Sequence, residues 1–179
     1  MKLTAGRPAD LAGREEKEIR VYDLLDQLQI AYQRMDHARA DTMADCVGID
    51  EVLQAQICKN LFLCNTQKTR FYLLMVAGDK KFKTGDVSKQ IGSARLSFAP
   101  YEYMETYLDI LPGSVSVMGL MNDKENRVQL LMDHELLESE YFGCHPCVNT
   151  ASMRIKTQDL LDKFLPAVGH VPVMVTVEK

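Results

Sequence analysis

The chain has 179 residues, of which 46% are hydrophobic and 26% charged, as in an ordinary globular domain, which excludes a disordered, collagen-like or coiled-coil chain. Its net charge of −4 excludes a protein that coats nucleic acid through overall positive charge. No stretch approaches the roughly 20 apolar residues of a membrane helix. The first residues lack a signal-peptide pattern, so we expect a cytoplasmic protein that does not enter a membrane.

The N-terminal part begins with an unpatterned segment. Residues 1–14 show no periodicity, so we predict a flexible arm ahead of one domain over residues 15–179. From Glu15 to Leu28, apolar residues recur at helical spacing behind several glutamates, which suit the helix dipole. A short strand over Ile30–Met35 follows. Asp41 or Thr42 can cap a second helix that ends near Gln54.

The middle of the chain predicts a β-hairpin. Ile57–Cys64 and Arg70–Ala77 are rich in branched and aromatic residues, and a polar loop joins them. The remaining predicted elements are, in order, a helix over Asp86–Ile91, a strand over Arg95–Phe98, a helix from Pro100 to Ile110, strands over Ser114–Met121 and Val128–Met132, an irregular segment over Phe142–Val148, a strand over Asn149–Ile155, a helix over Thr157–Leu165 and a strand over Val171–Val177.

The order of these elements favours one fold class. Helices and strands are mixed without a repeating βαβ pattern, which favours an α+β fold with a mixed, partly barrel-like β-sheet wrapped by helices. The glycine-rich phosphate-binding motifs are absent, as are the common metalloprotease and serine-hydrolase motifs. The sequence therefore gives no support to nucleotide hydrolysis or dinucleotide binding.

The most conspicuous short pattern is Cys144-His145-Pro146-Cys147. It fits a redox pair or half of a zinc site, but a zinc site needs two more ligands and no second close pair exists. The five cysteines are an odd number in a mid-sized chain, which favours free, buried thiols over a disulfide framework. His145 fits a general base as well as a loop histidine bonded to backbone.

Two further positions have a plain and a functional interpretation. Lys59 lies inside an apolar strand and either faces solvent or meets an anion in a pocket. Gly113 opens the segment to Val117, which is either an ordinary turn or a loop whose backbone approaches a ligand. Residue types and spacing alone leave both questions open.

Four segments in this order resemble one known family. They are His37 with Thr42 five residues later, the strand Cys58-Lys59-Asn60-Leu61-Phe62-Leu63, the loop from Leu111 to Val117, and His145-Pro146-Cys147-Val148-Asn149-Thr150-Ala151. The sequence resembles the YbaK/prolyl-tRNA synthetase-associated domain family over nearly the whole of residues 15–179, and within it the freestanding alanyl-tRNA(Pro) deacylases. The family loop usually ends in proline where this chain has Val117.

The resemblance implies a trans-editing hydrolase that removes the wrong amino acid from tRNA(Pro). It implies no metal, no cofactor and no covalent nucleophile: water attacks the ester with help from the 2′-hydroxyl of the terminal adenosine. The residues it assigns to catalysis are Lys59, Gly113, Ser114, Val115, Ser116 and Val117, and those it assigns to substrate binding are His145, Asn149, His37, Thr42 and Asn60.

The implied partner is the acceptor end of tRNA(Pro), with prolyl-tRNA synthetase as a second candidate and no role for DNA. Lys59, Lys80, Lys81, Lys83, Lys89 and Arg95 can supply phosphate contacts. Three alternatives stay open: a deacylase of Cys- or Ser-tRNA, a non-catalytic module that binds tRNA or a synthetase, and a redox or zinc protein. The first is supported by Val117, which stands where the family has proline.

Overall fold

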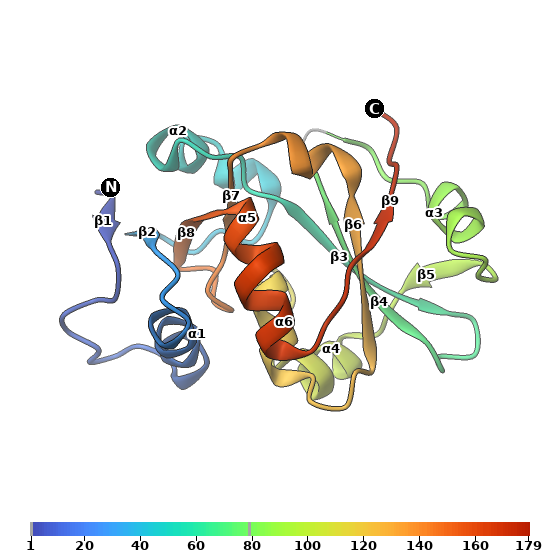
Figure 1. Ribbon diagram of the computed structural model, residues 1–179, viewed down its shortest axis with the longest axis horizontal. Coiled ribbons are helices and arrows are strands. Elements are labelled where there is room, and N and C mark those ends of the chain that lie inside the picture. The colour runs from blue at the N-terminus through green and yellow to red at the C-terminus, as the bar shows by residue number, and fades with distance from the viewer. Residues whose placement is uncertain (1, 79) are drawn as a thin grey trace.

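The computed structural model describes residues 2–78 and 80–179, and its strands form two sheets (Figure 1). The four-stranded sheet has the order β1-β2-β8-β7, with bounds Thr4–Ala5, Tyr32–Asp36, Ala151–Lys156 and Tyr141–Cys144. The five-stranded sheet has the order β5-β3-β4-β6-β9, with bounds Leu96–Phe98, Lys59–Asn65, Phe71–Val76, Val128–Asp133 and Val173–Val175. A parallel bridge between Ile57 and Gly143 joins them.

The helices enclose the five-stranded sheet on both faces. On one face lie α4, a 3₁₀ helix η2 and the continuous helix α5-η4-α6, which packs between the sheets in Figure 1; α3 covers part of the other face. The helix bounds are α1 Glu16–Gln27, η1 Met43–Cys46, α2 Ile49–Leu53, α3 Thr84–Gln90, α4 Tyr101–Leu108, η2 Val117–Asn122, η3 His134–Glu138, α5 Thr157–Asp159, η4 Leu160–Phe164 and α6 Leu165–Val168.

The sheets follow the sequence pattern. The strands β3 and β4 are antiparallel, with Leu61 opposite Leu74, whereas β4 and β6 are parallel. All six residues of β4 are buried, because helices cover both faces of this central strand. The α+β class is confirmed, and among the described residues the strands form two open sheets with no closed barrel.

Three local predictions are wrong. The helix expected from Asp41 to Gln54 is divided into η1 and α2, because Gly48 takes a left-handed φ of +89°. The strand expected over Ser114–Met121 is replaced by η2, where the Ser116 side chain accepts a hydrogen bond from the Met118 N–H and so competes with strand pairing. The segment expected to be irregular contains β7, which pairs with β8.

The N-terminal segment contacts the domain at several points. Thr4–Ala5 pairs with β2, and the Arg14 guanidinium donates to both Glu18 and Asp36. Arg7 forms an ion pair with Asp23 on α1. The division at residue 14 between an arm and a domain stays a prediction. Among the described residues, no helix is both long and apolar enough to cross a membrane.

Candidate functional site

A pocket of about 330 Å³ lies where the start of β3 meets η1, the Gly113 loop and the end of β7. It brings together six of the residues predicted from the sequence, namely Thr42, Lys59, Asn60, Gly113, Val115 and His145. The rest of its wall is mainly apolar: Ala40, Met43, Cys46, Ile57, Cys58 and Leu61, with Asp41 beside them. Segments far apart in the sequence therefore meet at one small, largely apolar cavity.

Among the described residues, Lys59 is the only lysine or arginine that lines this pocket. It is half-buried at the first position of β3, and its Nζ donates a hydrogen bond to the Lys80 carbonyl oxygen at 2.6 Å. Lys80 is itself buried, with its Nζ 2.7 Å from Asp133 Oδ2 and 3.2 Å from Glu135 Oε2. This buried ion pair fixes the carbonyl that holds Lys59, so Lys80 positions Lys59.

Asn60 contributes an acceptor that has no partner. Its Nδ2 donates to the Cys58 carbonyl at 3.1 Å, whereas Oδ1 is buried and accepts no hydrogen bond from the described residues. A buried polar atom without a partner costs free energy. In a pocket, such an oxygen is suited to a donor that the ligand brings.

His145 is buried in a network that fixes its tautomer. Its Nδ1 lies 3.0 Å from the Ala151 carbonyl, which can only accept, so Nδ1 carries the proton and Nε2 is left as an acceptor. Burial is the largest influence on its pKa, which is lowered from the ordinary value. The ring is therefore neutral near pH 7 and lines the pocket as a hydrogen-bond acceptor.

His37 reaches His145 through Ser152. His37 Nδ1 lies 2.7 Å from the Ala38 carbonyl, and its Nε2 lies 2.8 Å from Ser152 Oγ, which is 3.3 Å from His145 Nδ1. The Ser152 hydroxyl therefore donates to His37 and accepts from His145. His37 lies behind His145 and is not among the residues that line the pocket, and its contact with the substrate stays a prediction.

The loop at Gly113 forms another wall. Gly113 has a φ of +88°, and a Cβ there would lie 3.0 Å from Asp41 Oδ1 and 3.4 Å from Asn149 Nδ2. Asn149 Nδ2 donates to Asp41 Oδ1 at 2.8 Å, so this pair packs directly on the glycine. In the part of the chain that the structure describes, the backbone N–H groups of Gly113 and Val115 have no hydrogen-bond partner.

Four other predicted residues lie outside the pocket wall, and one that lines it has a second role. Ser114 and Asn149 line a separate hollow on the far side of the loop. Ser116 and Val117 are fully buried, and Ser116 caps η2. Thr42 does line the pocket, but its hydroxyl also forms a capping box with Asp45.

Some residues of the site carried little signal in the sequence. Ser152 and Lys80 act through neighbours that only the fold brings close, and Asp41 was visible only as a helix cap. A larger hollow of about 780 Å³ at the far end of the five-stranded sheet contains none of the predicted catalytic or substrate-binding residues.

The cysteines are all free and buried, as expected. Burial raises the pKa of Cys58 and of Cys147 to about 12, and it also raises the pKa of Cys144. Metal ligation and thiol exchange both need the thiolate, which these environments disfavour. Among residues 2–78 and 80–179, no three His, Cys, Asp or Glu side chains are grouped so that they could hold a metal ion.

Comparison with known proteins gives consistent results. The family model of the aminoacyl-tRNA editing domain matches residues 37–163. The chain is 32% identical to the prolyl-tRNA editing protein ProX of Acetoanaerobium sticklandii, over 82% of this chain and 88% of that one. It is 30% identical to prolyl-tRNA synthetase associated domain-containing protein 1 of Danio rerio, over 94% of this chain and 89% of the relative.

The fold has solved counterparts. One structure, described as a candidate trans-editing enzyme for prolyl tRNA synthetase, superposes with a TM-score of 0.67. The match covers 92% of this chain and 99% of that one at 16% identity, so it bears on the fold alone.

Proposed function

The chain belongs to the aminoacyl-tRNA editing domain family and is a deacylase, and from that premise we propose that it removes alanine from mischarged tRNA(Pro). The observation that carries this proposal is the 330 Å³ pocket, in which Lys59, the Gly113 loop and His145 surround a small apolar space. The relatives named for prolyl-tRNA editing and for the prolyl-tRNA synthetase associated domain support tRNA(Pro) as the carrier.

Alanine is the expected target because of how synthetases select amino acids. A synthetase site built for proline rejects a smaller side chain by only about 1–3 kcal/mol, or 10–200-fold. A second pocket that admits alanine and excludes the larger proline ring corrects the error. The apolar wall formed by Met43, Ile57, Leu61 and Val115 suits that sieve.

The Gly113 loop supplies the catalytic donors in this proposal. The N–H groups of Gly113 and Val115 bind the ester carbonyl oxygen and stabilise the oxyanion that develops on it. One such donor is worth about 10²–10³ in rate. Water, assisted by the 2′-hydroxyl of the terminal adenosine, bonds to the carbonyl carbon as the bond to the 3′-oxygen breaks. The 3′-oxygen takes the proton, which yields free alanine and tRNA, and no metal takes part.

Three side chains hold the substrate in place. Lys59 Nζ binds the phosphate or ribose of the terminal nucleotide, exchanging the Lys80 carbonyl for the ligand. The acceptors Asn60 Oδ1 and His145 Nε2 face the donors that the substrate carries, its ammonium and its ribose hydroxyl. Asn149 acts from behind the loop, through Asp41.

A deacylase of Cys- or Ser-tRNA is the second candidate, because cysteine and serine are close to alanine in size. Val117 is fully buried and does not line the pocket, so the departure from the family proline acts on pocket shape only through Ser116 and the loop. The prediction is therefore that alanine remains the preferred ester.

The test is hydrolysis of Ala-, Cys-, Ser- and Pro-tRNA(Pro) by the wild type and by Lys59→Ala, with Lys156→Ala as a control for an exposed lysine elsewhere. We expect rapid loss of the alanyl ester, a fall of at least about 10-fold in kcat/KM in Lys59→Ala, because a hydrogen bond to a charged group is worth about 1.5–3 kcal/mol, and no change in the control. Cleavage of Cys or Ser esters instead would overturn the alanine specificity. Binding of tRNA without hydrolysis of any ester would overturn the enzymatic proposal.

A further inference from the structure

Two oppositely charged regions flank the pocket. Between residues 41 and 51 the chain carries Asp41, Asp45, Asp50 and Glu51 and no Lys or Arg; we call this segment the acidic wall. Residues 66–95 carry seven Lys and Arg against two Asp; we call this segment the basic lobe. A chain with a net charge of −4 therefore concentrates positive charge on one side of the pocket.

The cations of the basic lobe are available to a partner. Six of the seven are exposed and have no ion pair among the described residues: Lys68, Arg70, Lys81, Lys83, Lys89 and Arg95. Lys80 is the exception, because it is buried against Asp133. The set expected from the sequence to contact phosphates thus loses Lys80, which serves the structure of the lobe.

The lobe is continuous with the pocket. Lys81 follows the residue whose carbonyl holds Lys59, and Lys83 precedes α3. Side chains alternate along a strand, so Lys59, Leu61 and Leu63 share the face that α3 covers. Lys59 and Leu61 line the pocket, and Leu63 pairs directly with Phe98 of β5.

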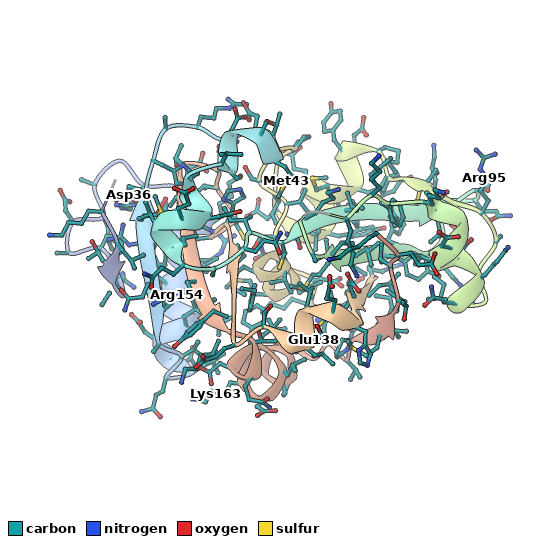
Figure 2. The ribbon with its side chains drawn as sticks, turned by 90° about the horizontal axis from the view of Figure 1, so that it is seen from above. Asp36, Met43, Arg95, Glu138, Arg154 and Lys163 are labelled. Atoms are coloured by element: carbon teal, nitrogen blue, oxygen red, sulfur yellow. The ribbon has the colours of Figure 1, made fainter. Side chains whose placement is uncertain are left out.

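Two exposed aromatic rings lie close together in the chain at the end of β5. Phe98 is 64% exposed and Tyr101, at the start of α4, is 55% exposed. Residues opposite each other in a sheet project from the same face, so Phe98 lies on the face of the sheet that carries Lys59 and Leu61, about 13 Å along β3 from Lys59. Figure 2 shows Met43 of the pocket near the middle of the molecule and Arg95 at the end that carries α3 and β5.

We propose that the acceptor arm of the tRNA leaves the pocket across the basic lobe. Its unpaired 3′ nucleotides stack on Phe98 and Tyr101, and the phosphates of the stem lie against Lys81, Lys83, Lys89 and Arg95. An ester seated in the pocket brings a polyanion with it, and that polyanion is repelled by the acidic wall and attracted by the lobe. Exposed rings give sequence-tolerant stacking for single-stranded bases. The inference rests on the proposed function.

The test measures binding of a tRNA(Pro) acceptor minihelix without an attached amino acid, between 50 and 200 mM salt. We expect Lys89→Gln/Arg95→Gln to weaken binding and to lower the slope of log K against log salt by about 1 to 2. The control Lys2→Gln/Lys156→Gln removes the same charge from two exposed positions, one ahead of β1 and one at the end of β8, and should bind as the wild type does.

A separate experiment tests the stacking of bases on the aromatic rings. Phe98→Ala should weaken binding at least about 5-fold, but only for a minihelix with its single-stranded 3′ end, and not for a blunt one. Wild-type affinity and slope in Lys89→Gln/Arg95→Gln, or equal effects of Phe98→Ala on both minihelices, would overturn the inference. Because this RNA carries no amino acid, its binding does not depend on ester hydrolysis. A failure of ester hydrolysis would therefore leave the binding result intact and would count against the proposed function alone.

Discussion

The acidic wall and the basic lobe border the same pocket but differ in charge and in the secondary structure on which they are built. The acidic wall is short, and the left-handed Gly48 divides it into two helices of four and five residues. The basic lobe is built on a five-stranded sheet and tied to it by the buried pair of Lys80 and Asp133. In the proposed complex, the sheet side holds Lys59 and the RNA, and the acidic wall borders the opposite side of the pocket.

The largest expected effect concerns the support of the lobe. Lys80→Met leaves Asp133 buried without its partner, and removing one member of a buried pair costs about 3–5 kcal/mol. We therefore expect the free energy of unfolding to fall by about 3 kcal/mol in urea denaturation. The matched control is the neighbouring exposed Lys81→Met, expected to change it by less than about 0.5 kcal/mol. Equal stability of the two variants would show that the pair does not hold the lobe.

A substitution at the boundary of the two regions comes next. Gly113→Ala places a methyl group 3.0 Å from Asp41 of the acidic wall at a left-handed φ, which costs about 1–2 kcal/mol. Because the N–H groups of this loop are the proposed oxyanion donors, we expect kcat for the alanyl ester to fall at least about 10-fold. Gly92→Ala, also left-handed but in open space, is the control. An unchanged kcat in Gly113→Ala would remove the loop from the mechanism.

The pH dependence should report His145. Burial lowers its pKa below the ordinary value of 6.5, so the neutral acceptor persists as the pH falls to that value. We expect kcat/KM to stay level from pH 8 to 6.5 and to decline only at lower pH. The contribution of His145 to stability has the same sign: it is complete above the unfolded pKa and is lost as the pH falls through the folded pKa. A decline that begins above pH 7 and persists in His145→Gln would show that another group sets the profile.

The smallest expected effect tests whether the negative charge of the acidic wall repels the RNA. Glu51 is exposed on α2, and Glu51→Gln removes one negative charge from the acidic wall. We expect the minihelix to bind about 2-fold more tightly at low salt, with no difference at high salt, because exposed charges are screened. Weaker binding in Glu51→Gln would mean that the RNA contacts this wall.

Local sequence predicted most elements, because the hairpin of β3 and β4 and helices such as α1 show clear periodicity. It failed at η2, where the mainly apolar run from Val115 to Met121 resembles a covered strand. Family motifs predicted Lys59, Gly113 and His145 in the pocket. The roles of Ser152 and Lys80 depend on contacts between distant segments, such as the Lys59–Lys80 hydrogen bond, and no local pattern encodes them.

The route of the RNA is tested most directly by photo-cross-linking. p-Benzoylphenylalanine is placed at Phe98 on the lobe side or at Val47, which is 79% exposed on the acidic wall. The RNA is an acceptor minihelix that carries alanine through a non-hydrolysable amide. We predict a cross-link from position 98 to the single-stranded 3′ nucleotides and none from position 47. A cross-link from position 47 alone would show that the RNA leaves the pocket over the acidic wall, and it would contradict the proposed route.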